Sequence, residues 1–203
     1  MKPEIKTIKV KPGELETLTA LHEHAVSLAE KSFADHGSAP FLWLIRIESG
    51  VLAINTPWEN VREKDQAVAT IRQILRIFDA TMYAFIAEAW ITVVTDPDKY
   101  DAKVPPSRQP DREDVLMVQS FDRNDNHLYT RFGVFYPPGR QRARSLPWGK
   151  LRARDDWPQD AHSGATGRLS NVFKHTGDEA WDREVDRSFA EFVEMLHKAR
   201  GGG

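Results

Sequence analysis

Two stretches of the chain place apolar residues at helical spacing. Between residues 14 and 36 they recur every three or four positions, and His36-Gly37 supplies a stop signal. The expected apolar stripe of this helix is Leu15, Leu18, Leu21, Ala25, Leu28 and Phe33. Residues 59–79 repeat the pattern, with Val61, Ala67, Ile71, Ile74, Leu75 and Phe78 as the expected buried face. Both helices are amphipathic and need an apolar surface to pack on.

Shorter runs, rich in β-branched and aromatic residues, predict strands. They cover residues 5–10, 41–58, 81–96, 115–121 and 127–136. Glu48-Ser49-Gly50 divides the second run into a hairpin, and the run over 81–96 is the expected central strand. Residues 137–175 show little periodicity and many turn residues, and a last amphipathic helix is expected from Thr176.

This order of elements predicts an α+β fold with a mixed β-sheet of about five or six strands and two helices packed on it. We expect a core domain over residues 1–136, an irregular basic segment over 137–175 and a C-terminal helix over 176–203. That helix packs either on the core or on a partner subunit, in which case the protein is a homo-oligomer.

Composition excludes several classes of chemistry. The chain of 203 residues has no cysteine, so it forms no disulfide, thiolate zinc site or cysteine nucleophile. It has no apolar run long enough to span a membrane and no secretory leader pattern, so a cytoplasmic protein is expected. Net charge is −2, yet residues 137–175 carry about +5 and the remainder about −7. The positive charge is therefore concentrated in one segment.

The basic segment is the most specific feature of the sequence. Its expected anion-binding residues are Arg140, Arg142, Arg144, Trp148, Lys150, Arg152 and Arg154. The cations form two triplets spaced by two, so each triplet lies on one face of an extended chain. Trp148 lies in the turn between them, where an indole could stack on a base or a guanidinium. The segment indicates either an anionic partner, which is nucleic acid or an acidic protein surface, or a solvated face neutralised by neighbouring aspartates.

His22, His24 and the Ser-x-x-Asp ending at Asp35 have the spacing of a metal site. This stretch resembles the zinc signature of the JAB/MPN metalloprotease family, in which two histidines and an aspartate hold the metal. On a helix, however, residues two apart point roughly 200° away from each other, so they cannot both reach one ion. The position after the second histidine, where the family has proline, is Ala25. We therefore expect surface histidines, with no metal and no other cofactor.

Two further resemblances concern the middle of the chain. The order of elements over residues 14–136 resembles the JAB/MPN fold, with "PSRQPD" (106–111) in place of its Ser-x-x-Asp loop and Ala87-Glu88-Ala89-Trp90 where its metal histidines fall. That resemblance implies a degenerate hydrolase scaffold without its ligands. The pattern "FIAEAW" followed by "PSRQPDREDVLMV" also resembles a family of bacterial and phage-encoded proteins, and it implies no catalytic residue.

The remaining candidates are single residues or incomplete motifs. Glu88 shares a strand face with Trp90, where it acts either as an acid or base with a raised pKa or as a partner of a helix end or an arginine. Asp122-x-Asn124-x-Asn126 matches half of a calcium loop but lacks the required glycine and glutamate, which favours a hairpin turn. Asp96, Asp98 and Asp101 could hold a divalent ion or be solvated, and His162 and His175 lack further ligands.

Three functions follow from these residues. The first is a non-enzymatic binding or accessory protein that contacts an anionic partner through residues 140–154. The second is a degenerate JAB/MPN-like hydrolase with a pocket at Glu88, Trp90 and residues 107–111. The third is an assembly subunit that oligomerises through its C-terminal helix. The sequence favours the first and predicts no catalytic residue.

Overall fold

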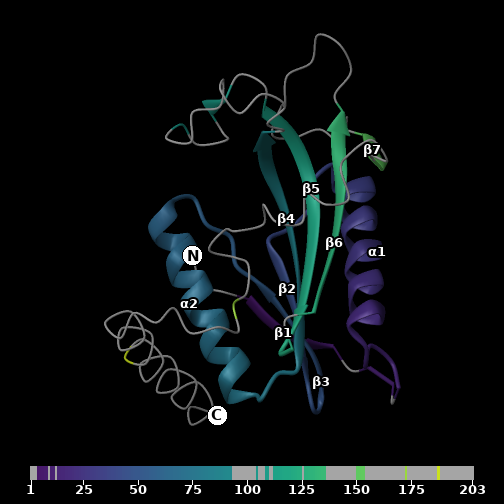
Figure 1. The fold of residues 1–203 in the computed structure, drawn as a ribbon, viewed down its shortest axis with the longest axis vertical. Coiled ribbons are helices and arrows are strands. Elements are labelled where there is room, and N and C mark those ends of the chain that lie inside the picture. Colours follow the sequence, from purple (N-terminus) through teal and green to yellow (C-terminus); the bar gives the residue numbers. More distant parts are fainter. Residues whose placement is uncertain are drawn as a thin grey trace.

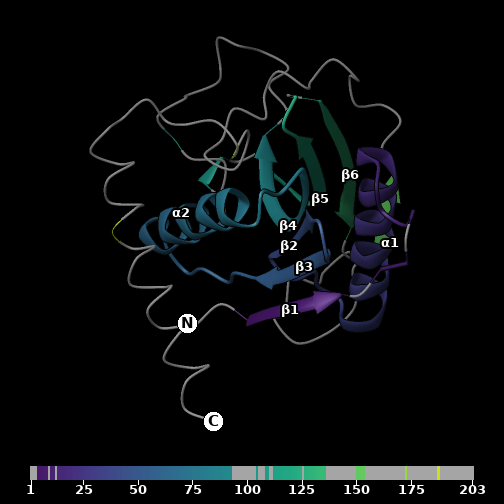
Figure 2. The ribbon, with the colours of Figure 1, turned by 90° about the horizontal axis from the view of Figure 1, so that it is seen from below.

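The computed structural model describes residues 4–8, 10–11, 13–92, 104, 108–109, 112–124, 126–135, 150–153, 172 and 187. These residues form one sheet with a helix on each face (Figures 1 and 2). The strands are β1 (Glu4–Ile8), β2 (Leu42–Ile47), β3 (Gly50–Asn55), β4 (Met82–Thr92), β5 (Arg112–Asp122), β6 (His127–Phe135) and β7 (Lys150–Ala153). The helices are α1 (Leu18–His36) and α2 (Val61–Ile77).

The predicted α+β class is confirmed, and the sheet itself is antiparallel rather than mixed. Its seven strands have the order β1-β3-β2-β4-β5-β6-β7, and each pairing between described strands is antiparallel. A helix between two strands, such as α2 between β3 and β4, often joins adjacent parallel strands. Here β2 lies between β3 and β4, so both pair with it in antiparallel register.

Helix α1 covers β4, β5 and β6 on one face of the sheet. It begins at Leu18 rather than near Glu14, because the Thr17 side chain accepts the N–H of Ala20 and caps the helix there. Gly37 ends it in the left-handed conformation, as predicted. Leu21, Ala25, Ala29 and Phe33 are buried, with sheet residues on this face such as Leu44, Ala84, Ile86, Leu116 and Val118.

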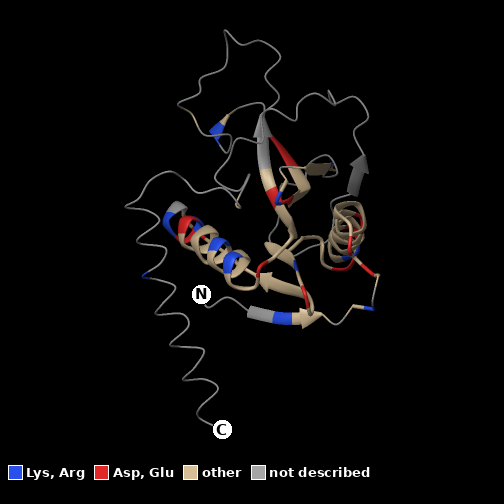
Figure 3. Cartoon of the chain, turned by 60° about the horizontal axis from the view of Figure 1, so that its bottom comes forward, with Lys and Arg blue, Asp and Glu red and all other residues tan. Residues whose placement is uncertain are grey.

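Helix α2 packs on the opposite face, over β2, β3 and β4. Its core residues are Val68, Ile71, Ile74 and Leu75, which meet an aromatic surface formed by Trp43, Tyr83 and Phe85. Charged positions occur along the rest of this helix (Figure 3). Neither described helix has the length and apolar character that a membrane-spanning helix requires.

Phe78 was expected on the buried face of α2, and this prediction is wrong, because its side chain is 44% exposed. The helix ends at this residue: Asp79 has a positive φ of 47°, and the Ala80 N–H donates to the carbonyl of Leu75. This turn directs the chain toward β4, so the helix ends before Phe78 can join its buried apolar face.

Two described parts of the segment 137–175 belong to this same fold. Lys150–Ala153 forms β7, which pairs with β6 at one edge of the sheet. Val172 is buried in the core beneath α2, and its N–H donates to the Tyr83 hydroxyl at 3.2 Å. The expected C-terminal helix lies outside the described residues, apart from Arg187.

Candidate functional site

His22 is buried, which corrects the expectation of a surface histidine. Its side chain leaves α1 toward the sheet and is 7% exposed. Nδ1 lies 2.8 Å from Ser120 Oγ on β5, and Nε2 lies 2.8 Å from Thr130 Oγ1 on β6. The sequence did not reveal this bond pair, because Ser120 and Thr130 are about a hundred residues away along the chain. The imidazole therefore joins α1 to two neighbouring strands.

The hydrogen bonds around His22 assign its tautomer. Ser120 is fully buried, and among the described residues its hydroxyl has one hydrogen-bond partner, Nδ1. A buried hydroxyl proton needs an acceptor, so Ser120 donates to Nδ1 and the Nε2–H donates to Thr130. Burial lowers the pKa of His22, and the Glu23 carboxylate opposes this in part. The neutral ring can accept the hydrogen bond from Ser120 and donate one to Thr130 at the same time.

This arrangement fits a structural clamp better than a catalytic pair. A general base acting on Ser120 would need a reacting group to reach a hydroxyl that is 0% exposed. His24 is half-buried and Asp35 is exposed. Within the described residues, no three His, Asp or Glu side chains gather closely enough to hold a metal ion.

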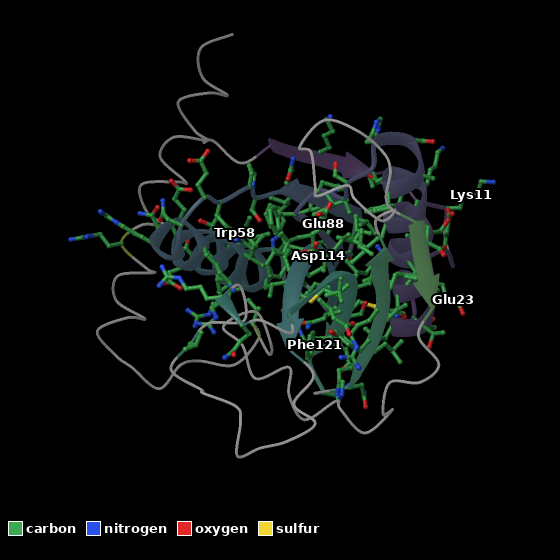
Figure 4. The ribbon with its side chains drawn as sticks, turned by 90° about the horizontal axis from the view of Figure 1, so that it is seen from above. Lys11, Glu23, Trp58, Glu88, Asp114 and Phe121 are labelled. Atoms are coloured by element: carbon green, nitrogen blue, oxygen red, sulfur yellow. The ribbon has the colours of Figure 1, made fainter. Side chains whose placement is uncertain are left out.

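Glu88 connects β4 to the chain that follows α1. Its Oε1 accepts the backbone N–H of Ala39 at 2.8 Å, three residues after α1 ends at His36. This is the arrangement toward a helix end that the sequence left open as an alternative to catalysis. Glu88 is labelled in Figure 4. The side chain of Trp90 lies outside the described residues, as does most of the 107–111 loop.

The turn between β5 and β6 explains the partial calcium pattern. Asp122 Oδ1 accepts the backbone N–H groups of Asn124 and Asn126, at 2.8 and 3.0 Å. Asp122 Oδ2 accepts the Asn126 side-chain amide at 2.8 Å. Both carboxylate oxygens therefore hold the hairpin turn together, as predicted. Asp96, Asp98, Asp101, His162 and His175 lie outside the described residues.

The predicted anion-binding residues fall mainly outside the described part of the chain. Arg140, Arg142, Arg144, Trp148 and Arg154 are not described. Lys150 and Arg152 are described in their backbone, as members of β7. They pair with Phe135 and Gly133 of β6, so they occupy alternate register positions of an edge strand. The backbone of two of the six basic residues therefore belongs to the sheet.

Beside β7, the structure shows a surface that the sequence reasoning missed. We call it the β5–β6 face; it consists of Met117, Gln119, Phe121, His127, Tyr129 and Arg131, on the α2 side of the sheet. The Arg131 guanidinium lies 5.0 Å from the centre of the Tyr129 ring. The ring of Phe121, which is labelled in Figure 4, stacks on the His127 ring with their centres 6.0 Å apart. The alternation in "HLYTRFG" was a signal, because it places Tyr129 and Arg131 on one side of the strand.

Gln119 lies at the centre of the β5–β6 face, between Phe85 of β4 and Tyr129 of β6. Its side-chain amide hydrogen-bonds Tyr129 and lies 3.9 Å from Met117 Sδ. The residue is 7% exposed, yet its Oε1 has no hydrogen-bond partner. A buried acceptor without a donor costs about 1–3 kcal/mol, so this atom requires an explanation.

Tyr129 is half-buried, and its surroundings shift the pKa of its hydroxyl in opposite directions. Burial raises the pKa of its hydroxyl, while the charge of Arg131 and hydrogen bonds from Arg131 and Gln119 lower it. The phenol therefore stays neutral at physiological pH and presents a ring with a cation beside it. Ring and cation together suit planar or anionic ligands.

A scan against protein-family models finds no match, and searches among curated proteins and solved structures find no significant match.

Proposed function

We propose that the protein is a non-enzymatic binding protein that holds nucleic acid through the basic segment and the sheet edge to which that segment connects. The observation that supports this most is the position of β7. It brings Lys150 and Arg152 into register beside β6, the strand that carries Arg131 and Tyr129. Basic residues from two parts of the chain thus belong to neighbouring strands at one edge of the sheet.

Nucleic acid fits the sheet edge formed by β6 and β7 better than an acidic protein surface does. Phosphate backbones bind clustered Lys and Arg residues, whereas stacking on bases requires exposed or half-exposed rings. Tyr129 is half-buried and His127 is exposed, and both lie on the face next to β7. An acidic protein would use the cations but would not require the rings.

Affinity measured against salt concentration tests the proposal. Fluorescence anisotropy of a labelled oligonucleotide should show binding that weakens steeply as salt rises. With six cations on phosphates, the affinity for a single strand should fall roughly 300-fold between about 50 and about 200 mM salt. Replacing all six basic residues of the segment with serine should abolish binding.

Two triple variants that change the net charge equally distinguish binding by the basic segment from a general effect of net charge. Replacing Arg140, Arg142 and Arg144 with serine should reduce the slope of log affinity against log salt by about 2. Replacing Lys11, Lys31 and Arg62, three exposed cations of the core, changes the net charge equally and should leave the slope unchanged. Undiminished binding by the six-residue variant would refute the proposal, and binding of an acidic protein but no oligonucleotide would replace nucleic acid with that partner.

A further inference from the structure

We propose, building on the proposed function, that the β5–β6 face binds the bases of a single strand, with Gln119 accepting a hydrogen bond and Tyr129 stacking. The basis of this proposal is the side-chain oxygen of Gln119, which has no hydrogen-bond donor. Gln119 Oε1 is buried without a donor, while the other end of the same amide is already engaged with Tyr129 and lies near Met117. The site therefore lacks one N–H donor.

The surroundings of that atom define the donor's chemistry. Gln119 is flanked in register by the aromatic side chains of Phe85 and Tyr129, and Phe121 is two residues along the same strand. Phe85 is fully buried, so a ligand can approach only from the side of the half-buried Tyr129 ring. A planar group that stacks on this ring and carries an N–H in its plane fits that approach. Nucleobases meet both conditions, because each has a π-face and either an amino or an imino N–H at its edge. Inorganic anions meet neither.

The position of the cations supplies the complementary charge. Arg131 lies over the Tyr129 ring, and the next strand, β7, carries Lys150 and Arg152. Strand β7 pairs with residues 132–135 of β6, so Arg152, opposite Gly133, is four residues along β6 from Tyr129, or about 13 Å. A single strand whose phosphates lie along β7 would therefore have to continue along β6 for its bases to reach Tyr129 and Gln119. A duplex has its base edges paired and its rings stacked, so a single strand fits this geometry.

Tyr129 controls access to Gln119. It lies directly opposite Gln119 on β6, and its hydroxyl contacts Met117 Sδ at 4.0 Å. Arg131 and Gln119 also hydrogen-bond this hydroxyl. For a base to reach Oε1, the half-buried ring has to move and exchange these contacts for stacking on the base.

Substitution of Gln119 gives the sharpest test, because stability and binding should change in opposite directions. Gln119→Met keeps the size of the side chain and removes the orphaned oxygen, so the melting temperature should rise. Affinity for a single-stranded oligonucleotide should fall about fivefold, since one hydrogen bond is lost. Gln73→Met is the matched control: Gln73 is also buried with an unpaired amide nitrogen, but it lies on α2. It should leave oligonucleotide binding unchanged.

Substitution of Tyr129 and a base-free polyanion complete the experiment. Tyr129→Leu should weaken single-strand binding about tenfold, because base stacking is lost. Inorganic polyphosphate has the charge without the bases, and its binding should not respond to either substitution. Equal effects on polyphosphate and oligonucleotide, or no effect on the oligonucleotide, would overturn the base-binding inference while leaving the phosphate contacts of the basic segment intact. If the wild-type protein binds neither the oligonucleotide nor polyphosphate, the proposed function itself is refuted.

Discussion

Acidification should weaken the fold through His22, the imidazole that joins α1 to β5 and β6. Burial lowers its pKa below the ordinary value of 6.5. In the unfolded chain the ring takes up a proton near pH 6.5, whereas the folded chain resists protonation until a lower pH. Between these two values the unfolded state binds more protons, so the free energy of unfolding falls as the pH falls. The slope for one group is at most about 1.4 kcal/mol per pH unit, and it vanishes above the unfolded pKa.

Burial is the main reason why the folded protein resists protonation of His22, and the hydrogen bonds act in the same direction. Protonation at Nδ1 turns that atom into a donor, so Ser120 must accept from it instead of donating to it. Ser120 is fully buried and has no second partner among the described residues, so its own proton loses its acceptor. A buried donor without a partner costs about 1–3 kcal/mol, which adds to the cost of placing a charge under α1.

Urea unfolding between about pH 8 and about pH 5 measures this effect. His22→Gln removes the titrating ring and keeps a donor and an acceptor for the two hydroxyls. The stability advantage of the wild type over this variant should shrink as the pH falls below 6.5. His24→Gln, two residues along the same helix, is the control, because it also removes a histidine but leaves the contacts of His22 with Ser120 and Thr130 in place. If His22→Gln loses stability with acid as steeply as the wild type, the reasoning fails.

Two other substitutions test the packing. Gly50→Ala should destabilise the protein by roughly 1–3 kcal/mol, because φ is 150° there and a Cβ would lie 2.9 Å from the carbonyl oxygen of Ile8. Gly13→Ala, with a positive φ but no atom within 4 Å of the added Cβ, should cost less, and equal losses in thermal unfolding would contradict this reading. Thr56→Val should cost about 1–3 kcal/mol, since it removes the 2.8 Å acceptor of the fully buried Trp43 indole N–H, and an unchanged urea midpoint would argue against that role.

The sequence predicted most elements because their signals are local. Periodic apolar residues marked α1 and α2, and Gly37 ended α1 as expected. The hairpin at Gly50, the edge strand β1 and the central strand β4 were also predicted, since alternation and turn residues act within a few positions. The prediction failed for Phe78, because the end of α2 depends on how the chain turns into β4.

Only the tertiary structure decided the strand order and the polar contacts. The sequence by itself contains the alternation of Tyr129 and Arg131, but not that Gln119 lies opposite Tyr129, because that register is set by β5 pairing with β6. His22 shows the same limit: its spacing from His24 suggested a solvent-facing pair, whereas its burial depends on hydroxyls that two distant strands supply. Spacing along a chain determines which side chains share a face, and only packing determines what that face meets.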